Sequence, residues 1–289
     1  MMKTGWYHLI VLLIVIIWGV TFVSTKILLF NGLAPKDIFF YRYLLAYTGI
    51  WFFGKQTLFA NNLKDEFLFL LMGITGGSLY FITENTALKI TLASNVSLLL
   101  CIAPLFTAIL SHWLIKTEKL NRYIVQGSLI AIIGVAFVAY NGRFILQINP
   151  LGDILCLIAA LSWAFYTILL KQLSSRYSTI LLTRKVFFYG LISLLPLFFF
   201  QPLSVEISVL QRPVVWGNLL FLGILASLFC YFLWNKAVKT LGAVRTTNYV
   251  YIAPLVTLLT SAIVINETIT LIAVIGALLI LTGVALAER

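Results

Sequence analysis

Long apolar runs separated by short polar connections dominate the pattern of this chain. Each run extends for about 18 or more residues with almost no charge, the length at which a helix rising 1.5 Å per residue crosses a hydrocarbon core about 30 Å thick. Pro35, Pro150 and Pro213 stand where such helices can begin without losing a hydrogen bond. The pattern predicts ten membrane-spanning helices, at about residues 6–29, 35–54, 67–88, 93–115, 122–140, 150–173, 179–200, 214–235, 243–265 and 270–287.

Composition supports the same class of protein. Of the 289 residues, 62% are hydrophobic and only 10% are charged, and the mean hydropathy is +1.05. A soluble domain needs far more charge to cover its surface. The apolar run that begins at Trp6 is too long for a signal peptide, and no small-residue cleavage site follows it, so it is predicted to be the first span. We therefore expect an all-α integral membrane protein.

The basic residues are unevenly divided between the two predicted sides of the membrane. The net charge is +11, but these residues are scattered through short connections, which argues against a nucleic-acid partner and for a lipid bilayer. Twelve would face the cytoplasm if the N-terminus does: Lys3, Lys55, Lys64, Lys116, Lys119, Arg122, Lys171, Arg176, Lys236, Lys239, Arg245 and Arg289. Four would face outward: Lys36, Lys89, Arg143 and Arg212. The asymmetry predicts a multi-pass protein of the inner or plasma membrane with both termini in the cytoplasm.

The two halves of the chain resemble each other at a spacing near 150 residues. The segment IAPLFT at 102–107 returns as IAPLVT at 252–257, and Trp18 precedes Lys26 by eight residues, as Trp163 precedes Lys171. Each repeat holds five spans, an odd number, so the repeats must enter the membrane from opposite sides. The sequence thus predicts two inverted five-helix units, residues 1–141 and 150–289. Such pairs suit transport by alternating access.

Several motifs occur in the same order along the chain. They are Ile17–Phe22 with Lys26, Tyr41–Tyr43, Ala-Pro-Leu-x-Thr at Pro104 and at Pro254, and the ending Glu267, Gly276, Gly283 and Val284. Together they resemble EamA-type members of the drug/metabolite transporter superfamily. The resemblance implies a ten-helix fold, a central cavity open alternately to each side, and transport, usually export, of small metabolites such as amino acids. Glu84 departs from that pattern, which more often has an apolar or aromatic residue there, so the resemblance implies no role for it.

Two prolines in the middle of predicted spans mark a candidate cavity. Pro104 and Pro254 each remove a helical hydrogen bond and free a carbonyl about one turn earlier, which in hydrocarbon must find a partner or line a wet cavity. Polar residues precede both prolines, among them Asn95, Asn248 and Tyr249. These residues are candidates for a substrate site. A packing kink without a ligand role is the alternative for the two prolines.

Charged side chains inside spans are the other candidates, since a charge at the centre of a bilayer costs about 2.5–3.5 kcal/mol on insertion scales. Arg42 is predicted to lie about 10 Å below the outer surface. Lys26 and Glu84 are predicted to lie a turn or less from the outer ends of their spans, so the three can form an outer cluster, with Lys171 and Arg184 as the cytoplasmic counterpart. For the lysines, snorkelling to the interface is an equal or better alternative. Arg42 and Arg184 are expected to serve a gate or the cavity.

Three readings of Glu84 stay open: a carboxylate that carries a coupling proton, a static ion pair at the outer gate, or simple exposure. Trp163 is a candidate cavity wall, with ordinary packing as the alternative. The paired glycines at 127 and 134, and at 276 and 283, predict close helix packing.

Enzymatic signatures do not emerge from the sequence. Cys101, Cys156 and Cys230 fall in apolar runs, and His8 and His112 have no spacing typical of zinc ligands. There is no P-loop and no recognisable nucleophile–base pair. We expect a secondary transporter that exports small polar metabolites, without a cofactor, metal or catalytic residues. A lipid-carrier flippase on the same fold remains an alternative, and an integral-membrane enzyme a weaker one.

Overall fold

The computed structural model describes residues 4–53, 58–91, 93–115, 122–140, 149–203, 205–265 and 270–287, and in these ranges it contains helices and no strands. The first half comprises α1 (Thr4–Phe30), α2 (Pro35–Ile50), η1 (Trp51–Phe53), α3 (Leu63–Gly73), η2 (Ile74–Ser78), α4 (Leu79–Ile90), α5 (Ala93–Leu100), α6 (Ala103–Leu114) and α7 (Arg122–Tyr140). The second comprises α8 (Pro150–Ser174), α9 (Thr179–Phe200), α10 (Ile207–Leu210), α11 (Pro213–Leu220), η3 (Phe221–Phe229), α12 (Cys230–Leu241), α13 (Ala243–Asn248), η4 (Tyr249–Ile252), α14 (Ala253–Ile265) and α15 (Leu271–Ala287).

These elements form the predicted spans. Five described stretches are long and apolar enough to cross a membrane by themselves: Gly5–Phe30, Leu63–Ile90, Pro150–Ser174, Thr179–Phe200 and Pro213–Leu241. Shorter apolar helices, including Ala103–Leu114 and Arg122–Phe137, account for others. The expected boundaries hold to within a few residues, and the largest differences are a start at Leu63 and an end at Leu241. The chain is thus an all-α membrane protein, as predicted.

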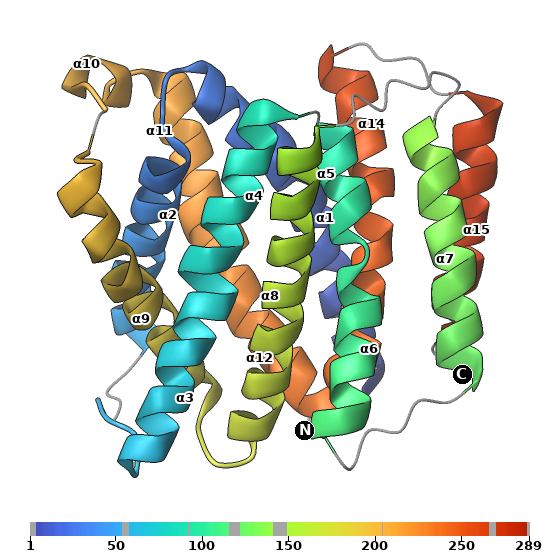
Figure 1. Ribbon diagram of the computed structural model, residues 1–289, viewed down its shortest axis with the longest axis horizontal. Coiled ribbons are helices and arrows are strands. Elements are labelled where there is room, and N and C mark those ends of the chain that lie inside the picture. Colours follow the sequence, from blue (N-terminus) through green and yellow to red (C-terminus); the bar gives the residue numbers. More distant parts are fainter. Residues whose placement is uncertain are drawn as a thin grey trace.

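The two halves run in opposite directions through the bundle (Figure 1). α1 begins at the end of the molecule where α15 finishes, whereas α8, the first helix of the second half, begins at the far end. The halves are interleaved: α9 packs against α2 and α3, α8 against α4, and α1 against α12 and α14. A space between these helices is therefore walled by both halves.

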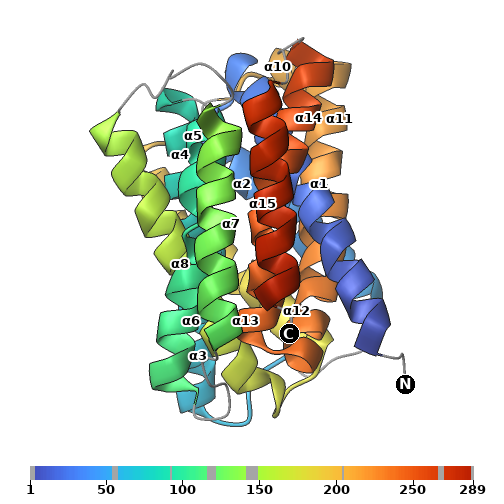
Figure 2. The ribbon, with the colours of Figure 1, turned by 90° about the vertical axis from the view of Figure 1, so that its right-hand side faces the viewer.

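α7 and α15 lie side by side (Figure 2), at one edge of the bundle (Figure 1). A Cβ added at Gly134 would stand 2.6 Å from the Gly276 carbonyl oxygen, and one added at Gly283 would stand 2.6 Å from the Ala131 nitrogen. The two backbones thus touch at the paired glycines, which confirms the predicted close packing.

Side-chain caps fix where three of the long helices begin. Asn62 accepts a hydrogen bond from the Asp65 N–H at 2.8 Å, and Asn149 accepts one from the Gly152 N–H at 3.1 Å. Ser178 accepts one from the Leu181 N–H at 3.3 Å at the start of α9. The first N–H groups of a helix lack partners within it, so these side chains set the entry points of α3, α8 and α9.

Candidate functional site

A cavity lies where the two halves meet, with about 640 Å³ of empty space including its open mouth. Its walls come from α1, α2, α4, α5, α6, α8, α12, η4 and α14. Six aromatic side chains line it: Trp18, Phe22, Tyr80, Phe81, Trp163 and Tyr231. Four polar or charged side chains also face it: Thr21, Arg42, Glu84 and Ser97. The cavity is therefore mainly aromatic with a few polar groups, the usual character of a small-molecule site.

Two tryptophans from equivalent positions of the repeat meet in this wall. The ring centroids of Trp18 and Trp163 are 5.2 Å apart in an edge-to-face arrangement, and Tyr80 lies 5.1 Å from Trp163. The Trp18 indole N–H donates to the Ala226 carbonyl at 3.0 Å. The Trp163 indole N–H is buried and has no hydrogen-bond partner within the described part of the chain. The residue lines the cavity, but its N–H lies behind the accessible surface of the wall.

Arg42 and Glu84 place opposite charges in the same cavity. The Arg42 side chain is 2% exposed; its Nε donates to the Ser227 hydroxyl at 3.0 Å, and its guanidinium lies 4.0 Å from the centre of the Phe81 ring. Glu84 is 6% exposed and accepts a hydrogen bond from the Tyr80 hydroxyl at 3.2 Å. The two charges are near enough to interact, yet no ion pair within 4.0 Å joins them among the described residues.

Lys26 lies outside this cavity, so the structure brings together only two members of the expected outer cluster. Its ammonium donates to the carbonyls of Leu88 at 2.5 Å and Thr91 at 3.1 Å, at the C-terminal end of α4. Lys171, its repeat equivalent, reaches the Val238 carbonyl at 3.5 Å near the end of α12. A cation at the last carbonyls of a helix is favourable for the helix itself. Both lysines thus stabilise helix ends.

Arg184 is also buried, with its guanidinium 5.2 Å from the centre of the Trp51 ring, where α9 faces η1. It does not line the central cavity. Of the expected gate or cavity role, the part in the cavity is therefore wrong, and the part in a gate stays a prediction.

The two mid-span prolines stand directly after breaks in their helices. α5 ends at Leu100 before α6, and a 3-10 turn separates α13 from α14. The carbonyl of Val250, which Pro254 leaves free, accepts a bond from the Cys101 thiol at 3.8 Å. A side chain at the first helix break thus donates to the carbonyl that is freed at the second, as expected because a freed carbonyl in hydrocarbon needs a partner. Pro104 and Pro254 themselves stand one residue beyond Ala103 and Ala253, which line the cavity.

The polar residues before the prolines have different surroundings. The Tyr249 hydroxyl lies 2.7 Å from the His8 Nδ1 atom. Asn248 is fully buried, and neither polar atom of its side-chain amide has a partner in the described ranges. The side chain of Asn95 lies outside the described residues. A buried amide without partners costs free energy, so Asn248 is the stronger candidate for a function that requires it.

Replacing Asn248 with alanine should lower substrate flux while leaving thermal stability nearly unchanged, because no described group depends on its amide. Asn235 provides the control: it is equally buried, but its amide bonds Tyr166 at 2.5 Å and Thr183 at 2.9 Å. Asn235→Ala should cost about 1–3 kcal/mol of stability by leaving those partners unsatisfied. Unfolding temperatures and proteoliposome flux of both variants make the comparison. Asn248 does not line the central cavity, and normal flux in Asn248→Ala would exclude a role for it in transport.

Two π-helical stretches, η2 and η3, were not predicted from the sequence. They interrupt the same span of each repeat and leave backbone carbonyls without their usual helical partners. Tyr43 and Tyr231 both donate to the Gly76 carbonyl, at 2.6 and 2.7 Å, and Trp18 donates to the Ala226 carbonyl. In the sequence, the Gly76-Gly77 dipeptide inside η2 was the one sign of an irregular helix. Such stretches are frequent at functional sites, and here their partners include two residues of the cavity wall.

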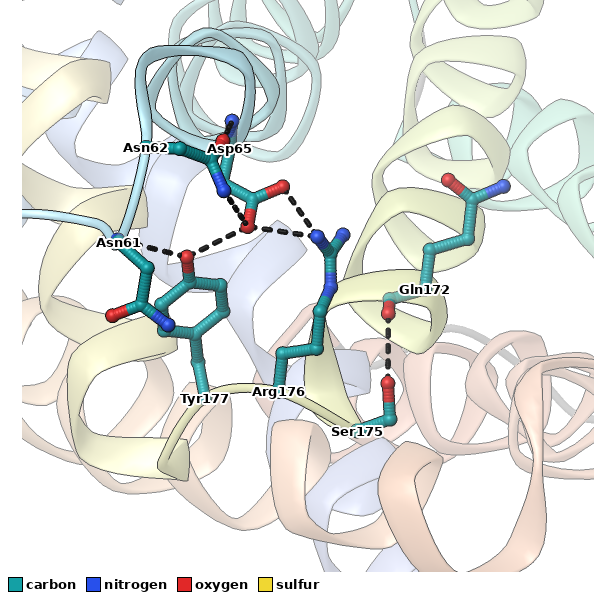
Figure 3. Close-up of polar contacts among 7 residues, drawn as sticks. All are labelled: Asn61, Asn62, Asp65, Gln172, Ser175, Arg176 and Tyr177. Atoms are coloured by element: carbon teal, nitrogen blue, oxygen red, sulfur yellow. Dashed lines mark hydrogen bonds and ion pairs between the residues drawn. The ribbon is translucent and has the colours of Figure 1, made fainter.

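A second polar cluster ties α3 to the turn between α8 and α9 (Figure 3). Both Asp65 oxygens accept bonds from Arg176 Nη1, at 2.6 and 2.8 Å, and one also accepts from the Tyr177 hydroxyl at 2.7 Å. The Tyr177 oxygen in turn accepts from the Asn61 N–H at 3.0 Å. The adjacent Glu66 pairs with Lys185 and Tyr189 of α9. These contacts cross between the halves at one end of the bundle, away from the cavity.

Known proteins provide a further comparison. The profile of the EamA-like transporter family matches residues 5–140 and again 150–288. An uncharacterized transporter of Archaeoglobus fulgidus is 30% identical over 284 residues, which are 96% of each chain. A "Probable terminal-alkyne amino-acid exporter" of Streptantibioticus cattleyicolor is 27% identical over 78% of this chain and 74% of its own. One solved structure, at 17% identity, shares the fold with a TM-score of 0.77 over 99% of this chain and 97% of its own.

Proposed function

Because the chain belongs to the EamA-like transporter family, we propose that it is a secondary transporter that exports a small polar metabolite, such as an amino acid, by alternating access. The observation that carries the proposal is the cavity between the halves, in which buried opposite charges stand inside aromatic walls. The opposed halves, which we propose as two five-helix repeats, residues 1–141 and 150–289, allow this cavity to face each side in turn. The amino-acid exporter among the relatives supports the substrate class.

Counterflow in proteoliposomes tests this function directly. Vesicles that contain the purified protein are loaded with a mixture of amino acids and other small metabolites. They should take up labelled members of the mixture faster than vesicles that contain the protein but no internal metabolites. A second set of vesicles, with a fluorescent lipid-linked sugar in one leaflet, tests lipid-carrier flipping. Flipping without metabolite counterflow would contradict the proposal and favour the flippase.

We propose a proton as the coupling ion, with Glu84 as its carrier. Glu84→Gln keeps the shape of the side chain but cannot ionise, so the variant should retain exchange at saturating substrate and lose uphill transport driven by a pH gradient. Lys26 lies outside the cavity, and its ammonium bonds the end of α4. Lys26→Gln is therefore a control that should keep both exchange and uphill transport. Undiminished uphill transport in Glu84→Gln would exclude this role.

We propose that the protein lies in the inner or plasma membrane with both termini in the cytoplasm. The basic asymmetry of the connections supports this orientation, and the described chain begins and ends at the same end of the bundle. Reporters fused at the N-terminus, after Lys119 and at Arg289 should read cytoplasmic, and one after Arg143 external. A cytoplasmic signal after Arg143 would overturn the orientation.

A further inference from the structure

We propose that Arg42 and Glu84 recognise the two charges of a zwitterion, so that the cavity selects α-amino acids with apolar side chains over ligands that carry one charge. The inference rests on the proposed function, since it treats the cavity as the transport site. It goes further by assigning the substrate carboxylate to Arg42 and the substrate ammonium to Glu84.

The unpaired state of the two charges is the first reason. Arg42 and Glu84 are almost fully buried in the same wall, where each isolated charge is costly. Direct pairing would reduce that cost, yet within the described ranges no ion pair joins them. The stack on Phe81 and the bond to Ser227 instead hold the guanidinium in place. A ligand with both charges, placed between them, supplies the missing partner to each.

The remaining bonding capacity of these groups fits such a ligand. In the described structure Arg42 uses only its Nε for a hydrogen bond, which leaves the terminal N–H groups for a carboxylate. Glu84 accepts only the Tyr80 hydroxyl, so its carboxylate keeps room for an ammonium.

Net charge explains the discrimination against singly charged ligands. Arg42 and Glu84 together are neutral, and a zwitterion keeps the filled cavity neutral. A ligand with only a carboxylate gains from Arg42 but is repelled by Glu84, and an amine meets the reverse. The attraction of the zwitterion and the repulsion of singly charged ligands thus both increase the difference in affinity between the two classes of ligand.

The aromatic walls define the rest of the ligand. Trp18, Trp163, Tyr80 and Tyr231 surround the charged pair with apolar faces, and the Trp163 ring is within 6 Å of the other three. An apolar or aromatic side chain buries its surface against these rings, whereas a polar one would lose hydration without finding partners.

Three matched probes test the assignment on the full-length protein in nanodiscs. Phenylalanine is the zwitterion, 3-phenylpropionate lacks only its ammonium, and phenethylamine lacks only its carboxylate. Binding is followed by quenching of tryptophan fluorescence, to which Trp18 and Trp163 contribute from the cavity wall. We expect phenylalanine to bind at least tenfold more tightly than either singly charged probe.

Variants assign each charge to its residue. Arg42→Gln should remove the preference for phenylalanine over phenethylamine but keep that over 3-phenylpropionate, and Glu84→Gln should do the reverse. Equal affinities for the three probes in the wild-type protein would overturn the inference even if no variant folds. So would a variant that weakens all three probes equally. If other metabolites show counterflow but the three probes bind equally well, the zwitterion assignment is wrong and the proposed transport function is retained. Selective binding without counterflow of any metabolite would support the zwitterion and count against transport.

Discussion

Replacing Asp65 with asparagine should raise the population of molecules open at the end of the bundle where α3 begins by about tenfold, which corresponds to about 1.4 kcal/mol. Asp65 lies on α3, in the first half, whereas Arg176 and Tyr177 belong to the second (Figure 3). A cavity that opens to this end by movement of one half against the other must break these contacts. The substitution keeps the shape of the side chain but removes its charge, so it weakens the closed state selectively.

The size of this effect follows from the surroundings of the carboxylate. The Asp65 side chain is 2% exposed and accepts charge-assisted bonds, each of which contributes about 1.5–3 kcal/mol. Arg176, however, is 47% exposed, and solvent screens its part of the pair. Glu66 and Lys185 hold the same helices together and remain intact in the variant. The net shift should therefore be near the lower end of that range.

Distances between spin labels at positions 64 and 175 measure the opening. Lys64 and Ser175, the native residues at these positions, are exposed and lie on either side of the Asp65 cluster. The three native cysteines are buried. Tyr177→Phe, which removes one donor to Asp65, should shift the distances in the same direction by less. Glu206→Gln removes an exposed carboxylate elsewhere and should change nothing. An unaltered distance distribution in a stable Asp65→Asn protein would show that this cluster does not hold the end closed.

The sequence predicted the spans well because bilayer thickness imposes one length on every crossing helix. It also predicted that Trp18 and Trp163 are equivalent, and the structure places their rings in contact. The sequence predicts how deep a residue lies along its span. It predicts less well the direction in which the side chain points around the helix axis. Lys26 has a depth compatible with Glu84, yet its long side chain turns to the carbonyls at the end of α4.

Long-range pairings were beyond the sequence for a different reason. Asp65 and Arg176 are 111 residues apart, and each reads as an ordinary charge of a cytoplasmic connection. The π-helical stretches depend on distant donors, such as Tyr43 and Tyr231, that stabilise the carbonyl of Gly76. Hydropathy contains no information on either. Both features arise from the way the two halves interleave.

Replacing Gly134 with alanine should lower the unfolding temperature of the purified protein by several degrees. The added Cβ would lie 2.6 Å from the Gly276 carbonyl oxygen and 2.7 Å from the Ile280 nitrogen. Both atoms belong to the backbone of α15, so the clash is relieved only by moving the two helices apart. Overpacking of this kind costs about 1–3 kcal/mol, and a rigid backbone neighbour favours the upper part of that range.

Gly217→Ala is the matched control, because the added methyl group would meet no described atom within 4 Å beyond its chain neighbours and the backbone of its own helix. It should leave the unfolding temperature unchanged or raise it slightly, since alanine favours a helix over glycine by about 1 kcal/mol. Gly283→Ala should repeat the loss, because its Cβ would stand 2.6 Å from the Ala131 nitrogen at the other glycine contact. The two contacts lie about two helical turns apart, roughly 10 Å, but the same separation of α7 and α15 relieves both clashes, so the double variant should lose less than the sum of the single losses. Equal unfolding temperatures for Gly134→Ala and Gly217→Ala would mean that α7 and α15 do not depend on this close approach.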